Sequence, residues 1–176
     1  FVGTMLWSIL LESMTSPLQQ TQAAQSMMTK INFPKEALIV SGIYKIVFNS
    51  IIKIVLIIAA MIILGVYPNT YSLLFPLSLV SLILFGTAIG LFLTPIGMLY
   101  TDIGKALPIV MQFFMYFSPV VYLAPKSGKL ATLININPIT PLITNARNWL
   151  TGYPGEALQY FIWINVAVIG LLFIGW

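Results

Sequence analysis

The stretch IVLIIAAMIILGV, residues Ile54–Val66, decides what kind of protein this is, because none of its thirteen residues carries a charged or strongly polar side chain. At 1.5 Å per residue such a helix is about 20 Å long, roughly 10 Å short of the hydrocarbon core of a bilayer. A span that contains it must therefore begin earlier, with Lys53 inside the membrane. The sequence predicts a membrane-spanning helix over residues 38–66.

The rest of the chain is similarly apolar. Of its 176 residues, 59% are hydrophobic and 7% are charged, whereas soluble domains carry about 25% charged residues. This length accommodates about four or five spans. We predict an all-α integral membrane protein, a polytopic helical bundle forming one domain over residues 1–176, with approximate spans at 1–11 (partial), 38–66, 72–98, 106–124 and 158–176. The apolar ends, Phe1–Leu11 and Tyr160–Trp176, favour a piece of a longer membrane protein.

Two segments between the predicted spans have a different character. Residues 12–36 are polar and rich in Gln and Ser, so we expect no span there, but a short surface helix that ends before Pro34. Residues 125–157 are broken by Pro and Gly. We expect them to form two short re-entrant helices, about Ser127–Ile136 and Pro141–Leu150, covered by protein or by a watery cavity.

Small residues and prolines mark the third and fourth spans. Gly86 and Gly90 are four residues apart, a spacing that allows another helix to approach closely. Pro119 is expected to bend the fourth span near its far end.

The positions of the basic residues predict the orientation. With the segment 12–36 on the inner side, that side has Lys30, Lys35, Lys45 and Lys105, and the outer side has Lys126, Lys129 and Arg147. Lys and Arg are in excess on the cytoplasmic side of membrane proteins. The count of four to three favours this orientation.

Four polar residues recur at a spacing of four along the second predicted span: Ser41, Lys45, Asn49 and Lys53. Residues at this spacing lie on one face of a helix. Charged side chains at membrane depth usually face a bundle interior or water, which favours a substrate path. The alternative is that Lys45 and Lys53 extend their long side chains to the lipid headgroups.

The fourth span is rich in aromatic residues, including Tyr116, Phe117 and Tyr122. Such side chains are common in the core of membrane proteins and in the belts that face lipid. Their flat faces also suit the apolar C–H surfaces of sugar rings, provided that they face a channel.

Several kinds of chemistry are excluded or unsupported. The chain has no cysteine and no histidine, which removes disulfides, thiolate and imidazole catalysis and the usual zinc sites. Its four acidic residues are dispersed, so no carboxylate pair is expected, and no phosphate-binding loop of the form G-x-x-x-x-G-K-[ST] occurs. Basic runs that would suit nucleic acid are absent. We therefore expect no catalytic residue, metal or cofactor in this chain, and an energy source in a partner.

Three motifs resemble a known family. The segment KINFPKE (residues 30–36) resembles the V-x-F-P-R-E segment of ABC-exporter permeases for polysaccharides such as O-antigen, capsule and teichoic acid. The stretch from Tyr100 to Tyr122, which begins YTDI and ends FSPVVY, resembles their Y-R-D-V…F-x-S-P-V-I-Y stretch, and NPITPLI (137–143) is the third match. Thr101 and Lys35 stand where the family commonly has Arg.

The resemblance implies a fold and a set of partners. The fold is a six-span permease with short re-entrant outer helices, in the bacterial cytoplasmic (inner) membrane. The permease pairs with a second copy as a homodimer and with separate nucleotide-binding subunits that hold ATP and Mg²⁺, and it exports a lipid-linked polysaccharide.

The resemblance also implies residue roles. The translocation path would be lined by Ser41, Lys45, Asn49, Lys53, Tyr116, Phe117 and Tyr122. The segment that contacts the ATPase would be Phe33, Pro34, Lys35 and Glu36, with Asp102 in a cytoplasmic loop, and the outer gate would contain Asn137, Pro138 and Arg147.

Two alternatives stay open at the level of sequence. A permease of the same superfamily could carry small molecules instead of a polymer. A membrane enzyme that acts on lipid-linked sugars would require acids or histidines clustered at one membrane face, which this chain does not offer.

Overall fold

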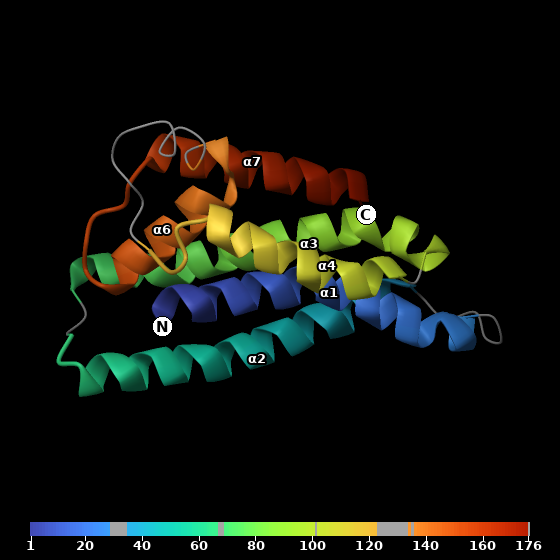
Figure 1. The fold of residues 1–176 in the computed structure, drawn as a ribbon, viewed down its shortest axis with the longest axis horizontal. Helices are drawn as coiled ribbons and strands as arrows, with labels where there is room; N and C mark the ends of the chain where they lie inside the picture. Colours follow the sequence, from blue (N-terminus) through green and yellow to red (C-terminus); the bar gives the residue numbers. More distant parts are fainter. Residues whose placement is uncertain (29–34, 67–68, 101, 123–133, 135, 176) are drawn as a thin grey trace.

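The structure is a computed structural model that describes residues 1–28, 35–66, 69–100, 102–122, 134 and 136–175 (Figure 1). Among these residues there is no strand, which confirms the all-α prediction. The helices are α1 (Val2–Met28), α2 (Lys35–Ile63), the short 3-10 helix η1 (Thr70–Leu74), α3 (Phe75–Leu99), α4 (Asp102–Phe117), α6 (Ile139–Leu150) and α7 (Leu158–Gly175).

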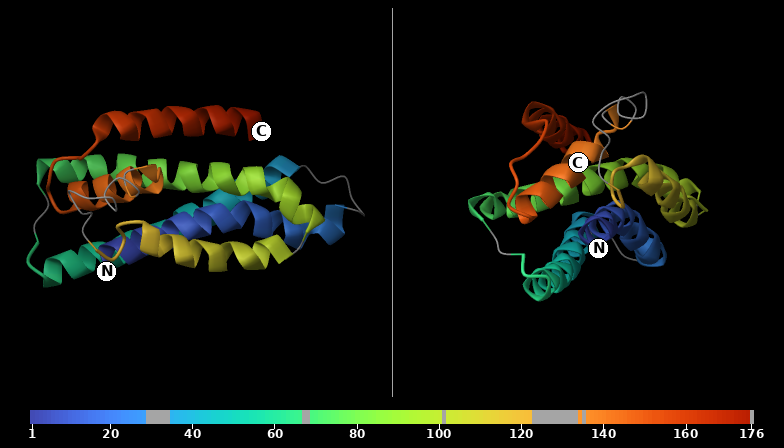
Figure 2. Two further views of the ribbon diagram at one scale, coloured as in Figure 1. Left: turned by 45° about the horizontal axis from the view of Figure 1, so that its top comes forward. Right: turned by 60° about the vertical axis from the view of Figure 1, so that its left-hand side comes forward.

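Helix α1 is the centre of the bundle. It contacts α2, α3, α4 and α6, whereas α7 packs against α3 and α6 (Figures 1 and 2). The sequence led us to expect a break after Leu11, followed by a separate surface helix. That expectation is wrong for the described residues, because α1 continues from Val2 to Met28 with Pro17 inside it.

The polar residues of α1 explain why the helix does not stop. Ser13, Thr15 and Thr21 are buried, and each hydroxyl donates a hydrogen bond to the carbonyl four residues earlier in the same helix. Such bonds satisfy the hydroxyl without water. The polar composition that suggested a surface segment therefore belongs to a helix packed among its neighbours.

Helices α1 and α3 pack with their backbones unusually close. A Cβ atom on Gly86 would lie 2.6 Å from Ser13 Cβ and 2.9 Å from Leu10 O, and one on Gly90 would lie 3.0 Å from Pro17 Cγ. Only glycine fits such gaps. The expectation that Gly86 and Gly90 allow close helix contact is thus confirmed, and the helix they contact is α1.

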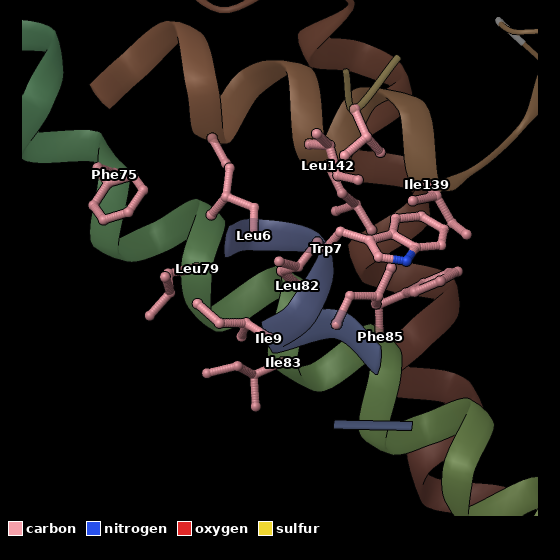
Figure 3. Packing of buried hydrophobic residues seen from close by; sticks show 14 of the residues in the cluster. Leu6, Trp7, Ile9, Phe75, Leu79, Leu82, Ile83, Phe85, Ile139 and Leu142 are labelled. Carbon is pink, nitrogen blue, oxygen red and sulfur yellow. The ribbon is translucent and has the colours of Figure 1, made fainter. Parts of the chain in front are cut away.

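The hydrophobic core is built on this pair of helices. Figure 3 shows Leu6, Trp7 and Ile9 of α1 packed among side chains of α3 and α6, which include Phe75, Leu79, Leu82, Ile83, Phe85, Ile139 and Leu142. All of them are buried. Helix α6, which matches the helix predicted at Pro141–Leu150, is thus anchored to the core; its re-entrant character stays a prediction, and most of Ser127–Ile136 lies outside the described residues.

Two of the described helical stretches are long and apolar enough to cross a membrane: Val40–Ile63 and Thr70–Leu99. They correspond to the spans predicted at 38–66 and 72–98. The C-terminal stretch Leu158–Leu172 is apolar but shorter. The predicted total of six spans therefore remains an expectation.

The fourth predicted span is shorter in the structure than in the prediction. We expected residues 106–124 with a bend at Pro119, but α4 ends at Phe117 and the chain turns at residues 118–122. Proline lacks the N–H that a continuing helix needs, so Pro119 lies in a turn and not inside a bent helix. The turn is completed by contacts with α6 that the sequence alone does not reveal.

Candidate functional site

A polar cluster connects α2 to α1. The carboxylate of Glu12 on α1 accepts a hydrogen bond from Lys53 Nζ at 2.8 Å through Oε2, and another from Asn49 Nδ2 through Oε1. The Lys53 and Glu12 side chains are 21% and 23% exposed. Each partner thus satisfies the other in a place with little access to solvent, which is the arrangement expected for charges at membrane depth.

Helix geometry explains why only half of the predicted polar stripe takes part. Each step of four residues advances about 40° around an α-helix, so the stripe turns by about 120° from Ser41 to Lys53. Accordingly Ser41 and Lys45 are exposed, whereas Asn49 and Lys53 are half-buried and bonded to α1. Neither interpretation of Lys53 from the sequence, a substrate path or a bond to headgroups, included Glu12 as its partner.

Glu12 is the functional candidate that sequence reasoning missed. It was placed in a polar segment outside the membrane, although a signal was present. The residues Thr4, Ser8, Glu12, Ser16 and Gln20 recur at a spacing of four, as the polar residues of α2 do. Ser16 Oγ, in the same series, donates to Gly42 O of α2 at 3.3 Å.

The aromatic side chains of α4 lie on the surface of this single chain. Phe113, Tyr116 and Phe117 are each about two-thirds exposed, and Met111 is the buried residue of the helix. Tyr122 is also exposed, and its hydroxyl donates to Tyr116 O at 3.2 Å. The structure therefore brings Tyr116, Phe117 and Tyr122 together at one end of α4 and leaves their rings available to lipid, cargo or a partner.

The end of α4 is fixed to the start of α6. Asn137 Nδ2 donates to Ser118 Oγ at 2.9 Å, and its Oδ1 accepts from the backbone N–H of Ile139 at 3.0 Å. Arg147 Nη1 lies 3.3 Å from Tyr122 O and 3.4 Å from Pro119 O, and donates to both. Two of the predicted outer-gate residues, Asn137 and Arg147, thus hold the turn that follows α4 and contains Tyr122, and the exposed Pro138 lies between Asn137 and α6.

Other predicted site residues are not brought together. Phe33 and Pro34 lie outside the described residues, and Lys35 and Glu36 begin α2, at the opposite end from Ile63. Asp102 is exposed in the first turn of α4, where an acidic residue complements the positive end of the helix dipole. Helix α2, which carries the polar residues, and helix α4, which carries the aromatic residues, lie on different sides of α1 (Figure 2).

The described residues offer little for bond-making chemistry. They contain no group of three His, Cys, Asp or Glu side chains that could hold a metal ion. Glu12, the best-placed acid, is engaged by Lys53 and Asn49.

An all-helical bundle with long apolar helices defines the class as helical membrane proteins, and comparison with known proteins gives the family. The sequence model of the family described as "ABC-2 type transporter" matches residues 1–151. This match covers most of the chain, which therefore belongs to the ABC-2 type transporter family.

One curated relative carries a more specific description. The chain is 21% identical over 149 residues to the O-antigen export system permease protein RfbA of Myxococcus xanthus. The match covers 82% of this chain and 57% of that relative, so the chain spans little more than half of the relative's length. The resemblance to polysaccharide-export permeases that the three motifs suggested is confirmed by these two matches.

Proposed function

We propose that this chain is part of the membrane-spanning subunit of an ATP-driven exporter that moves a lipid-linked polysaccharide across the bacterial cytoplasmic membrane. Family membership and the similarity to an O-antigen export permease support a transport subunit. The observation that carries the choice of cargo is the exposed aromatic end of α4, where Tyr116 and Phe117 lie beside Tyr122 of the turn that Asn137 and Arg147 hold.

The proposal assigns a role to each part of the chain. A separate subunit binds ATP and Mg²⁺ and contacts the segment from Phe33 to Glu36, and Asp102, which begins α4, lies on the same cytoplasmic side. Two permease copies form a homodimer, and the polymer passes between them. The outer part of the path is lined by Tyr116, Phe117 and Tyr122 and gated by Asn137, Pro138 and Arg147; the inner part is lined by Ser41, Lys45, Asn49 and Lys53.

Aromatic side chains suit this role for a physical reason. They present large rigid faces at a low cost in conformational entropy, because few torsion angles must be fixed. A polymer that slides through a path needs many weak contacts of this kind. Tight and directional bonds would hold each sugar in place.

An export assay tests the choice of cargo. Cells that lack the permease gene are complemented with the wild type or with Tyr116→Ala or Phe117→Ala, and polymer at the cell surface is measured together with the amount of permease in the membrane. We expect a several-fold loss of export at unchanged amounts of protein.

Trp163→Ala provides a matched control, because Trp163 of α7 is as exposed as Tyr116 but lies on a different helix. Export unchanged by both α4 substitutions would remove these rings from the path. If the wild-type gene restores transport of a small molecule and leaves the amount of polymer at the cell surface unchanged, the protein is instead a small-molecule exporter of the same family.

A further inference from the structure

Helix α2 contacts the rest of the protein mainly along one side. Among the described residues, α1 is the only helix against which α2 packs extensively, and the remaining sides of α2 expose large apolar side chains. The attachment has two polar points. One is the contact of Ser16 with Gly42, and the other is the cluster of Glu12 with Asn49 and Lys53.

The first point allows the helices to approach closely. A Cβ atom on Gly42 would lie 3.1 Å from Ser16 Oγ and 3.3 Å from Gln20 Cγ, so a larger residue would force these side chains to shift by a few tenths of an ångström. A single neutral contact of this kind fixes a distance but allows one helix to swing about the other. The second point lies eleven residues further along α2, about 16 Å away along the axis.

The second point lies deep in the predicted span. Lys53 is about 27 Å along the axis from Lys35, where α2 begins, and about 15 Å before Ile63, where it ends. A lone charge at such a depth is costly, and removing one partner of an ion pair leaves the other uncompensated. The carboxylate of Glu12 bonds two side chains of α2 at once, which fixes direction as well as distance.

Beyond this cluster the packing of α2 is incomplete. An open cavity of about 340 Å³ lies between the far end of α2 and the helices η1 and α6; it is lined by Ile54, Ile58, Met61, Ile62, Val66, Ser72, Phe75 and Leu150. The far end of α2 thus has room to move, and the Glu12 cluster is the last polar tie before it.

We infer that Glu12 is a positioning residue, whose bonds to Asn49 and Lys53 make α1 follow any displacement of α2. The inference rests on the proposed function, in which the start of α2 adjoins the segment that contacts the ATPase. A displacement of the start of α2 is transmitted along this helix to Asn49 and Lys53. Their bonds to Glu12 then displace α1, together with the core that α1 shares with α3. Without the cluster α2 moves alone, and the energy of ATP hydrolysis does not reach the path.

The test compares single, double and swapped variants of the whole permease, assembled with its ATPase in lipid vesicles. Glu12→Gln and Lys53→Met each remove one charge, and the swap Glu12→Lys with Lys53→Glu restores the pair in reverse. ATP hydrolysis and polymer export are measured on the same vesicles. We expect export per ATP to fall roughly fivefold or more in the single variants, the lower end of typical coupling between sites, and to recover in the swap.

A second readout does not depend on the cargo. The chain has no cysteine, so spin labels attached to Ile63→Cys and Leu73→Cys, two exposed sites at the end of α2 and in η1, report the distance across this end of the bundle. The distance distribution should broaden in Glu12→Gln and Lys53→Met and narrow again in the swap. Lys105→Met, which removes one exposed positive charge from α4, is the matched control and should change neither readout.

The outcomes separate this inference from the proposed function. Wild-type coupling in the double variant Glu12→Gln with Lys53→Met, or a swap that restores neither readout, overturns the role of Glu12. A broader distribution of the spin-label distance with unchanged export per ATP also overturns the role of Glu12. The position of α2 would then vary more without any effect on coupling. If the wild type moves no polysaccharide, the proposed cargo is wrong, and the spin-label distances still decide whether the cluster ties α2 to α1.

Discussion

Among its neighbours α2, α3, α4 and α6, helix α1 contacts α3 and α2 in different ways. Against α3 it packs backbone to backbone, with Gly86 and Gly90 in gaps that no larger residue fits. Against α2 it packs through buried apolar side chains, among them Ile46 and Ile57, and through a few directional polar contacts, next to an open cavity of about 340 Å³. Close packing resists displacement because any shift creates overlap or a void. The side of α1 that faces α3 is therefore packed more tightly than the side that faces α2.

The largest expected effect is on the close-packed side. Gly86→Ala and Gly90→Ala each place a methyl group where Ser13, Met14 or Pro17 already stands, and overpacking of this kind costs about 1–3 kcal/mol. We expect a lower unfolding midpoint for the full permease in detergent. Gly170→Ala is the control, because no atom of the described residues beyond the adjacent backbone of its own helix lies within 4 Å of its added methyl group, so it should be neutral or slightly stabilising. Equal effects at all three glycines would show that the side facing α3 is not close-packed.

A hydrogen bond across the same side gives a smaller effect. Gln22 Nε2 donates to Gly97 O at 2.8 Å, joining α1 to α3 near their ends. Gln22→Leu removes this bond and should cost about 1 kcal/mol, the usual net value of one neutral hydrogen bond. The measurement is the same unfolding midpoint. Gln19→Leu, at an exposed position of α1, should leave it unchanged.

On α2 itself, we expect Ser50→Ala to leave the stability unchanged or to raise it. Ser50 is buried, and its Oγ has no hydrogen-bond partner among the described residues. Ser50→Ala removes a polar atom whose burial is uncompensated, so the midpoint should stay constant or rise by an amount equivalent to about 1 kcal/mol. A clear loss of stability would mean that the hydroxyl has a partner in the assembled permease.

The smallest effect is expected where the cavity can take up added volume. Met61 is buried at the cavity, and Met61→Phe adds an aromatic ring on the side where space exists. We expect a change within about 0.5 kcal/mol of zero, because the void accommodates part of what would otherwise be overpacking. The loss of stability in Met61→Phe should therefore be smaller than the loss in Gly90→Ala. Equal losses would mean that α1 is packed as closely against α2 as against α3.

Much of the fold could be predicted from the sequence, because long apolar runs specify helices that cross a bilayer. The stretches Val40–Ile63 and Thr70–Leu99 appear where the runs placed them, and the helix predicted at Pro141–Leu150 is present as α6. The helix ends were harder to predict. Hydropathy indicates how apolar a segment is, but it does not show that polar residues of α1 such as Ser13 and Thr15 are buried against other helices.

The candidate site shows the same division. A spacing of four identified Asn49 and Lys53 as members of a polar stripe. It did not show that the stripe faces α1 only at its C-terminal residues, Asn49 and Lys53. The aromatic residues of α4 were visible in the sequence, whereas the bonds from Arg147 to the carbonyls of Pro119 and Tyr122 join residues far apart in the chain. Backbone carbonyls are present in every residue, so no sequence signal marks the ones that a side chain will bond.

The sequence by itself determined that this protein is helical and apolar enough for a membrane, and it supplied the motifs that resemble the ABC exporters. Tertiary structure alone decided that Glu12 and Lys53 face one another, that α1 runs unbroken past Leu11, and that α2 borders a cavity. The reason is physical. Hydrophobicity and helix period are properties of neighbouring residues in the chain, whereas an ion pair and a cavity depend on how whole helices meet.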